Sequence, residues 1–110
     1  FPDLAGVYSA TDDMAAGVIG AFDAAGKTGV KFSASNLSPT AQEMIKSGKL
    51  ACTSIQKIVD SGTAALNAAL AAARGEKVET NVVTPALLVA ADNVNSVDLS
   101  DVVAPADYRP

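Results

Sequence analysis

The feature that most constrains the fold is the alternation of apolar, strand-like runs with stretches of helical spacing. Strand and helix patterns follow each other three times, and a further strand comes after them. The expected strands cover residues 4–10, 30–35, 50–55 and 82–90, the last of them broken by Pro85, and the expected helices cover residues 12–25, 39–46 and 58–74. Strands that are apolar along most of their length and alternate with helices predict an α/β fold, in which helices cover both faces of a parallel sheet.

Capping signals place the ends of these helices. Thr11 or Asp12 can cap the first helix, and Ser38, followed by a proline, opens the second. Gly26 and Gly48 follow the first two helices, as glycines that terminate helices do. An apolar stripe is expected along the first helix, made of Met14, Ala15, Val18, Ile19 and Phe22.

Composition excludes several classes of function. The chain has 110 residues, which suits one domain, and its net charge of −4 with no cluster of Lys or Arg argues against a nucleic-acid partner. Histidine is absent, which removes Ser-His-Asp and Cys-His catalysis and argues against zinc. The single cysteine, Cys52, lies in an expected strand and reads as a small core residue. No apolar run approaches the roughly 20 residues of a membrane span.

Two adjacent carboxylates, Asp12 and Asp13, stand where the first helix begins. Neighbouring residues of a helix point about 100° apart, so these two cannot easily share a substrate atom. Negative charge in a first turn is favoured by the helix dipole. No third acidic residue lies nearby to complete a metal site. Both residues are therefore interpreted as helix-starting residues, with no catalytic or metal-binding role.

Polar side chains follow three of the expected strands. Thr11 comes after the first strand, Asn36 after the second and Gln56 at the end of the third. In parallel α/β sheets, ligands bind at the carboxyl ends of strands, where loops lead into helices. Gln56 has two readings of similar weight: a turn residue satisfied by backbone groups, or a donor and acceptor for a neutral polar ligand.

Five segments carry a family resemblance. The first two are 10–17 (ATDDMAAG), similar to A-x-N-D-D-M-A-x-G, and 21–26 (AFDAAG), similar to A-L-x-x-A-G. The third is 45–56 (IKSGKLACTSIQ), similar to I-x-x-G-x-L-x-A-T-x-x-Q. The last two are Gly62 followed by 70–78 (LAAARGEKV), similar to G-…-L-x-G-x-x-V, and 91–94 (ADNV), similar to T-x-x-N-V. In this order they resemble the C-terminal part of ribose-type periplasmic sugar-binding proteins of bacterial ABC transporters. The resemblance extends over nearly the whole chain.

The resemblance implies a fold of two Rossmann-like lobes with a sugar or similar solute between them. Residues 1–56 would form strand–helix units of the C-terminal lobe. Residues 57–84 would cross over as a helix and strand of the N-terminal lobe, and residues 85–110 would return to the C-terminal lobe and end in a tail. Full members of the family are longer, so this chain is expected to be a C-terminal fragment that needs the remaining N-terminal part of the same protein as a partner.

The resemblance also assigns ligand-binding roles to Thr11, Asn36 and Gln56. Gln56 matches a glutamine at the crossing between lobes, and Thr11 stands where the family has an asparagine. Asn36 replaces the aspartate of a G-F-D-G segment, and Leu37 replaces its second glycine. The changes at Thr11 and Asn36 shorten or neutralise a hydroxyl-binding group. They argue against a plain ribose-like pentose and leave another polyol, a modified sugar or a different polar solute.

The function implied by the resemblance is solute binding for an ABC importer, without catalysis, cofactor or metal. Its partners would be a sugar-like solute and a membrane permease, in the periplasm or, lipid-anchored, outside a Gram-positive cell. The alternative is the effector-binding half of a lactose-repressor-type regulator, which shares the fold; the segment Cys52–Gln56 and the absence of an I-x-V-x-G-F-D strand favour the transporter. An enzyme of flavodoxin-like fold is a third reading, disfavoured by the absence of histidine and of a phosphate loop.

Overall fold

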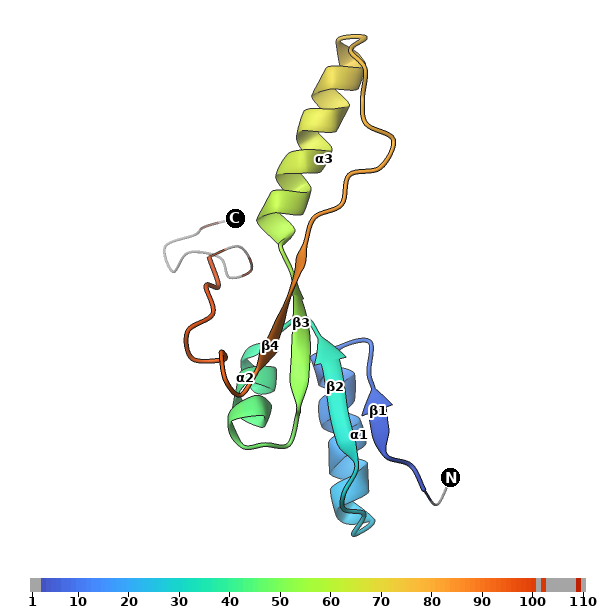
Figure 1. The fold of residues 1–110 in the computed structure, drawn as a ribbon, viewed down its shortest axis with the longest axis vertical. Coiled ribbons are helices and arrows are strands. Elements are labelled where there is room, and N and C mark those ends of the chain that lie inside the picture. Colours follow the sequence, from blue (N-terminus) through green and yellow to red (C-terminus); the bar gives the residue numbers. More distant parts are fainter. Residues whose placement is uncertain (1–2, 101, 103–108, 110) are drawn as a thin grey trace. The chain divides into compact units, whose positions relative to one another are not determined.

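The computed structural model describes residues 3–100, 102 and 109 and contains the expected succession of strands and helices (Figure 1). The elements are β1 (Gly6–Tyr8), α1 (Asp12–Ala24), β2 (Lys31–Ser35), α2 (Pro39–Lys46), β3 (Cys52–Gln56), α3 (Ile58–Ala73) and β4 (Ala86–Ala90). Helix bounds agree with the sequence prediction to within one residue. The strands at either end are shorter than predicted, and β4 begins only after Pro85, because proline lacks the N–H that a strand interior requires.

The strands form a four-stranded sheet in the order β1-β2-β3-β4. The pairs β1–β2 and β2–β3 are parallel, with Tyr8 beside Ser33 and Ser33 beside Cys52. β4 runs in the opposite direction (Figure 1), so the sheet is mixed and mostly parallel. α1 and α2 contact each other. The β1-α1-β2 and β2-α2-β3 units advance in the same direction across the sheet. Because such crossovers share one handedness, both helices lie on the same face of the sheet.

The chain divides into two compact units. The first is made of Phe1–Ile55 and Leu88–Val97, and the second of Gln56–Leu87 and Asp98–Pro110. Every buried apolar residue of the described part of the chain belongs to the first unit; the largest fully buried apolar side chains are Ile45, Leu50 and Val89. The first unit therefore contains the hydrophobic core.

The core of the first unit lies between the sheet and its two helices. Phe22 of α1 and Phe32 of β2 meet edge to face, with ring centroids 5.4 Å apart, a favourable aromatic geometry. Ala15 and Ile19 of α1 are buried, but Met14 is 60% exposed, so the predicted stripe was wrong at that position. The inward face of α1 is centred one residue later in the helix than the sequence spacing suggested.

Local hydrogen bonds terminate α1 and α2 at the predicted glycines. Gly26 and Gly48 have φ angles of 65° and 75°, in the left-handed region that glycine tolerates best. The amide following each glycine donates back into the last turn, from Lys27 to the Phe22 carbonyl and from Lys49 to the Met44 carbonyl. This is the Schellman pattern, which satisfies carbonyls that a helix end otherwise leaves unpaired.

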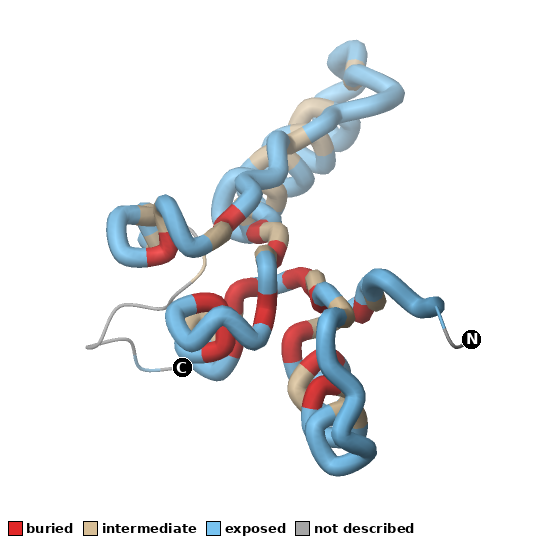
Figure 2. Tube along the Cα trace, turned by 60° about the horizontal axis from the view of Figure 1, so that its bottom comes forward, coloured by how far each residue is buried: buried red, intermediate tan, exposed pale blue. Residues whose placement is uncertain are grey.

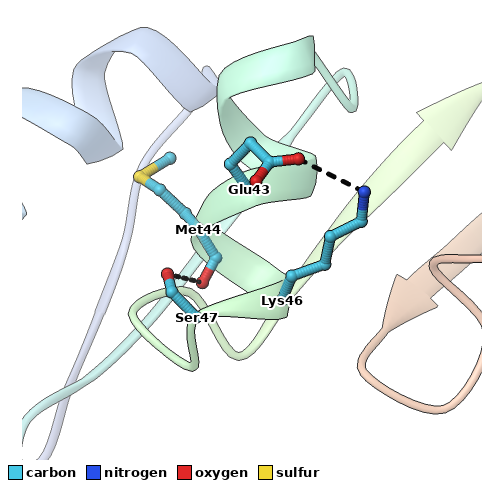
Figure 3. Close-up of polar contacts among 4 residues, drawn as sticks. All are labelled: Glu43, Met44, Lys46 and Ser47. Atoms are coloured by element: carbon cyan, nitrogen blue, oxygen red, sulfur yellow. Dashed lines mark hydrogen bonds and ion pairs between the residues drawn. The ribbon is translucent and has the colours of Figure 1, made fainter.

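The last turn of α2 carries two more polar contacts (Figure 3). Lys46 Nζ donates to Glu43 Oε1 at 3.2 Å, and the Ser47 hydroxyl donates to the carbonyl of Met44 at 3.2 Å. Both Lys46 and Glu43 are solvent-exposed, so their ion pair adds little to stability. The serine hydroxyl adds to the amides of Lys49 and Leu50, which also donate to the Met44 carbonyl, so this carbonyl at the helix end is well satisfied.

The second unit contains α3 and an extended segment that follows it. None of its described residues is buried, and Figure 2 shows α3 coloured as exposed or intermediate along its length. Leu66 and Leu70 of α3 are 61% and 46% exposed. The Ser61 and Thr84 hydroxyls share a hydrogen bond of 2.8 Å. Among the described residues, no helix has the length and apolar character needed to cross a membrane.

One carboxyl of the second unit has a shifted pKa. The backbone amide of Ser100 donates to Asp98 Oδ1 at 2.9 Å. This hydrogen bond favours the ionised carboxylate and lowers the pKa of Asp98. Asp98 is fully exposed and forms part of a surface turn.

Candidate functional site

The carboxyl end of the sheet, where β1, β2 and β3 finish, is the candidate site. Loops there connect β1 to α1 and β2 to α2. Parallel strands place their carboxyl ends together, and the following helices direct their amino termini to the same end. Two of the predicted ligand residues, Thr11 and Asn36, lie in these loops, and the third, Gln56, is the last residue of β3.

Thr11 is the capping residue of α1. The sequence had left Thr11 and Asp12 as alternative caps. Its backbone is extended, with φ −137° and ψ 158°, and its hydroxyl oxygen accepts from the amide of Met14 at 3.4 Å. That distance is long for a hydrogen bond, so the cap is weak. The hydroxyl proton is left to donate elsewhere. Thr11 can thus cap the helix and bind a polar ligand at the same time.

Asn36 is exposed just after β2, with a left-handed φ of 109°. Its backbone amide donates to the carbonyl of Ser54 at 2.8 Å, which extends the pairing of β2 with β3 by one residue. Its side-chain amide makes no hydrogen bond with the rest of the described chain. One acceptor and two donor hydrogens are therefore available to a ligand.

Leu37 follows with a second left-handed φ, of 57°, yet its side chain is only 4% exposed. A left-handed backbone costs a leucine about 1–2 kcal/mol. Burial of the side chain in the core offsets that cost. Leu37 therefore fixes the loop by packing, at the position where the resembled sequence pattern has glycine.

Leu37→Gly is expected to lower the free energy of unfolding by about 2 kcal/mol, because removing a buried leucine costs about 2–5 kcal/mol and relief of backbone strain returns about 1–2 kcal/mol. Urea denaturation followed by circular dichroism measures this difference. Unchanged or increased stability would show that the backbone conformation, and not the packing, dominates at this position.

Gln56 is exposed at the end of β3. It is also the first residue of the second unit. Within the described chain, its side-chain amide makes no hydrogen bond. Like Asn36, it presents an amide group that no side chain or backbone group of the described chain occupies.

Asp12 has a role that the sequence analysis missed. It is 1% exposed, and its two oxygens have separate partners. Oδ2 accepts from the backbone amide of Ser38 at 2.7 Å, and Oδ1 accepts from the hydroxyl of Thr53 at 2.8 Å. The available signal was its spacing from the buried residues Ala15 and Ile19, three and seven positions later, which places Asp12 on the inward face of α1.

Asp13, by contrast, is exposed, as expected for a helix-starting carboxylate. The described residues contain no group of three or more His, Cys, Asp or Glu side chains that could hold a metal ion. The polar groups at the carboxyl end of the sheet are instead hydroxyls, amides and the fully hydrogen-bonded Asp12. This set of groups is suited to binding a neutral, hydroxyl-bearing molecule.

An apolar groove of about 290 Å³ lies at the other end of the first unit. Residues from the end of α1 and from the segments before β1 and β2 line it, including Phe22, Val30 and Lys27. It is located at the amino ends of the strands, where α/β sheets do not bind their ligands. Its lining is mostly apolar and includes Lys27 and Thr28.

Comparison with known proteins gives one family match. The family described as periplasmic binding protein domain matches residues 1–77. No curated protein sequence matches the chain closely enough to add to this.

Solved structures of several transport proteins share the fold. An ABC transporter periplasmic solute-binding protein from Actinobacillus succinogenes with bound D-allose has 26% identity and a TM-score of 0.73, over 88% of this chain and 34% of its own. An ABC transporter solute-binding protein from Agrobacterium vitis, bound with α-D-tagatopyranose, has 26% identity and a TM-score of 0.74, over 86% and 32%. An ABC transporter solute-binding protein from Bacillus halodurans with bound myo-inositol has 36% identity and a TM-score of 0.67, over 82% and 31%. The chain thus spans about a third of the length of each.

Proposed function

The chain belongs to the periplasmic binding protein domain family, and on that premise we propose that it is part of the solute-binding component of an ABC importer. The observation that carries this proposal is the chemistry at the carboxyl end of the sheet. Thr11 and Asn36 present neutral hydrogen-bonding groups there, in a family of binding proteins and in the place where such sheets bind ligands.

The proposed ligand is a neutral polyhydroxylated solute, a sugar or cyclic polyol. The three similar proteins described above bind D-allose, α-D-tagatopyranose and myo-inositol, which are all rings bearing hydroxyl groups. Hydroxyls both donate and accept, so they pair well with the amides of Asn36 and Gln56 and the hydroxyl of Thr11. Because Asn36 is uncharged, we expect recognition without charge-assisted bonds at this position.

We further propose that residues 1–56 belong to the C-terminal lobe and that residues 57–84 cross to the N-terminal lobe. Residues 85–110 would return to the C-terminal lobe and end in a tail. The absence of any buried residue along α3 supports this division, since a helix with exposed leucines is stabilised by packing against another surface. The remaining N-terminal part of the same protein is the partner expected to cover Leu66 and Leu70. A membrane permease is the further partner, and the location is periplasmic or, with a lipid anchor, extracellular.

A thermal-shift panel of sugars and polyols tests the function in the protein expressed at the full length its gene encodes. A ligand at 100 times its Kd stabilises the folded state by about 2.7 kcal/mol, so a true solute raises Tm in a concentration-dependent way. At least one hexose, pentose or inositol is expected to do so. A folded protein whose Tm responds to no member of the panel would contradict solute binding of this class.

Thr11→Val is expected to weaken solute binding by about 2- to 12-fold, because the isosteric side chain removes one hydrogen bond of about 0.5–1.5 kcal/mol. Asp13→Asn, a change at an exposed neighbour, is expected to leave affinity nearly unaltered. Isothermal titration calorimetry at a temperature below the Tm of the variants measures the change in affinity separately from the stability lost with the helix cap. Thr11→Ser keeps the hydroxyl and is the matched control. The reverse order of effects, with Asp13→Asn weakening binding and Thr11→Val neutral, would overturn the role given to Thr11.

A further inference from the structure

We infer that Asp12 is a positioning residue: its buried carboxylate holds the loop of residues 36–38 so that Asn36 is presented to the ligand in one conformation. That a ligand binds at Asn36 rests on the proposed function, whereas the positioning role of Asp12 is argued from the geometry of the first unit. Asp12 accepts hydrogen bonds from the Ser38 amide and the Thr53 hydroxyl, at 2.7 and 2.8 Å. One side chain thereby connects the start of α1, the start of α2 and the strand β3.

No cation of the described residues forms an ion pair with Asp12. The ion pairs of the described residues join Lys46 to Glu43, Lys49 to Asp23 and Lys57 to Asp60, and none includes Asp12. Its charge lies instead in the first turn of α1 and against the amide that precedes α2, so the dipoles of both helices stabilise it. A charged acceptor also strengthens the bond from Ser38 beyond that of a neutral amide pair.

The loop that Asp12 holds has an unfavourable backbone. Asn36 and Leu37 are consecutive non-glycine residues with φ angles of 109° and 57°. Residues in such sparsely populated regions persist only where their surroundings determine them. On the strand side, the Asn36 amide is fixed to the carbonyl of Ser54. On the helix side, the Ser38 amide is fixed to Asp12.

Two consequences follow from this arrangement. Without the bond to Asp12, the loop keeps the packing of Leu37 but loses its hydrogen bond on the helix side, so the side chain of Asn36 gains access to other orientations. Thr11 immediately precedes Asp12, so the same carboxylate also ties the Thr11 loop to the Asn36 loop. Asp12 thus holds the Asn36 loop against the start of α1 without touching the ligand.

A double-mutant cycle tests the inference in the protein expressed at the full length its gene encodes, with the best solute of the sugar panel. Asp12→Ala is expected to weaken binding about tenfold in the wild-type background and by less than about twofold in the Asn36→Ala background, since coupled residues are non-additive. Asp12→Asn can accept from Ser38 and donate to Thr53, so it is expected to restore affinity to within about twofold. Equal weakening in both backgrounds would mean that Asp12 is merely structural and would overturn the inference.

A ligand-free measurement separates failure of this inference from failure of the proposed function. Amide hydrogen exchange by NMR is expected to show the Asn36 amide exchanging at least about tenfold faster in Asp12→Ala, while the Ala51 amide, bonded to the Phe32 carbonyl, stays protected. If no solute binds but this exchange pattern holds, the function fails and the positioning role stands. If Asn36 exchange does not change, the positioning role fails whatever the solute data show. If Asp12→Ala does not fold, Asp12→Ser is the second variant, because it keeps a polar side chain but shortens the reach to the Ser38 amide by one bond.

Discussion

Ile45→Ala is expected to lower the free energy of unfolding by about 2–5 kcal/mol, one of the two largest effects anticipated for this chain. Ile45 is 1% exposed on the inward face of α2, in a core that also contains Ala41 and Leu50. Truncation removes apolar burial and leaves a cavity that close-packed neighbours fill only in part. Because globular proteins are stable by only about 5–15 kcal/mol, such a loss is a large share of the total.

Urea or thermal unfolding, followed by circular dichroism, measures the effect of Ile45→Ala. Met14→Ala is the matched control, since Met14 is also on a helix of the first unit but is 60% exposed. Alanine is a good helix former, so this control is expected to change stability by less than about 0.5 kcal/mol. Equal losses in the two variants would contradict the core assigned here and would mean that Met14 packs as the sequence stripe suggested.

Asn36→Asp is expected to shift solute preference by about tenfold or more. An ionised acceptor strengthens a hydrogen bond from about 0.5–1.5 to about 1.5–3 kcal/mol, and about 1.4 kcal/mol is a tenfold change in affinity. The variant carries the residue of the resembled sequence pattern, and its carboxylate accepts from two hydroxyls but cannot donate. Affinity for a ribose-like pentose should therefore rise relative to affinity for the best solute of the unmodified protein.

Calorimetric titration with both solutes gives the ratio of the two Kd values. Thr40→Asp is the matched control, because it adds the same charge at an exposed position on the first turn of α2. That control is expected to leave the ratio unchanged. A similar shift in both variants would indicate a long-range effect of charge, and no shift in Asn36→Asp would place Asn36 away from the solute.

Local sequence signals predicted much of the fold. Ser38 accepts from the Ala41 amide at 3.1 Å as the cap of α2, and Gly26 and Gly48 follow the helices they were expected to end. These features depend on residues within a few positions of each other, so they can be predicted from the local sequence. The succession of strands and helices follows from periodicity in the same way.

Features that depend on distant partners were not predictable to the same degree. The exposure of Met14 depends on where α1 lies against the sheet, and the direction of β4 depends on the path taken after α3. Asp12 was interpreted as a helix-starting residue because its partners, Ser38 and Thr53, are 26 and 41 positions away. The choice of Thr11, Asn36 and Gln56 used both a general rule for α/β sheets and a family resemblance, and their contacts with a solute remain predictions.

NMR mapping shows where in the fold the solute binds. The full-length protein is titrated with its best solute, and shifts are followed at the side-chain amides of Asn36 and Gln56 and at the backbone amide of Thr11. These signals are expected to move with saturation at the calorimetric Kd, while those of Phe22 and Lys27, which line the apolar groove at the amino ends of the strands, stay unchanged. Shifts confined to Phe22 and Lys27, with Asn36 and Gln56 unaffected, would contradict a solute site at the carboxyl end of the sheet.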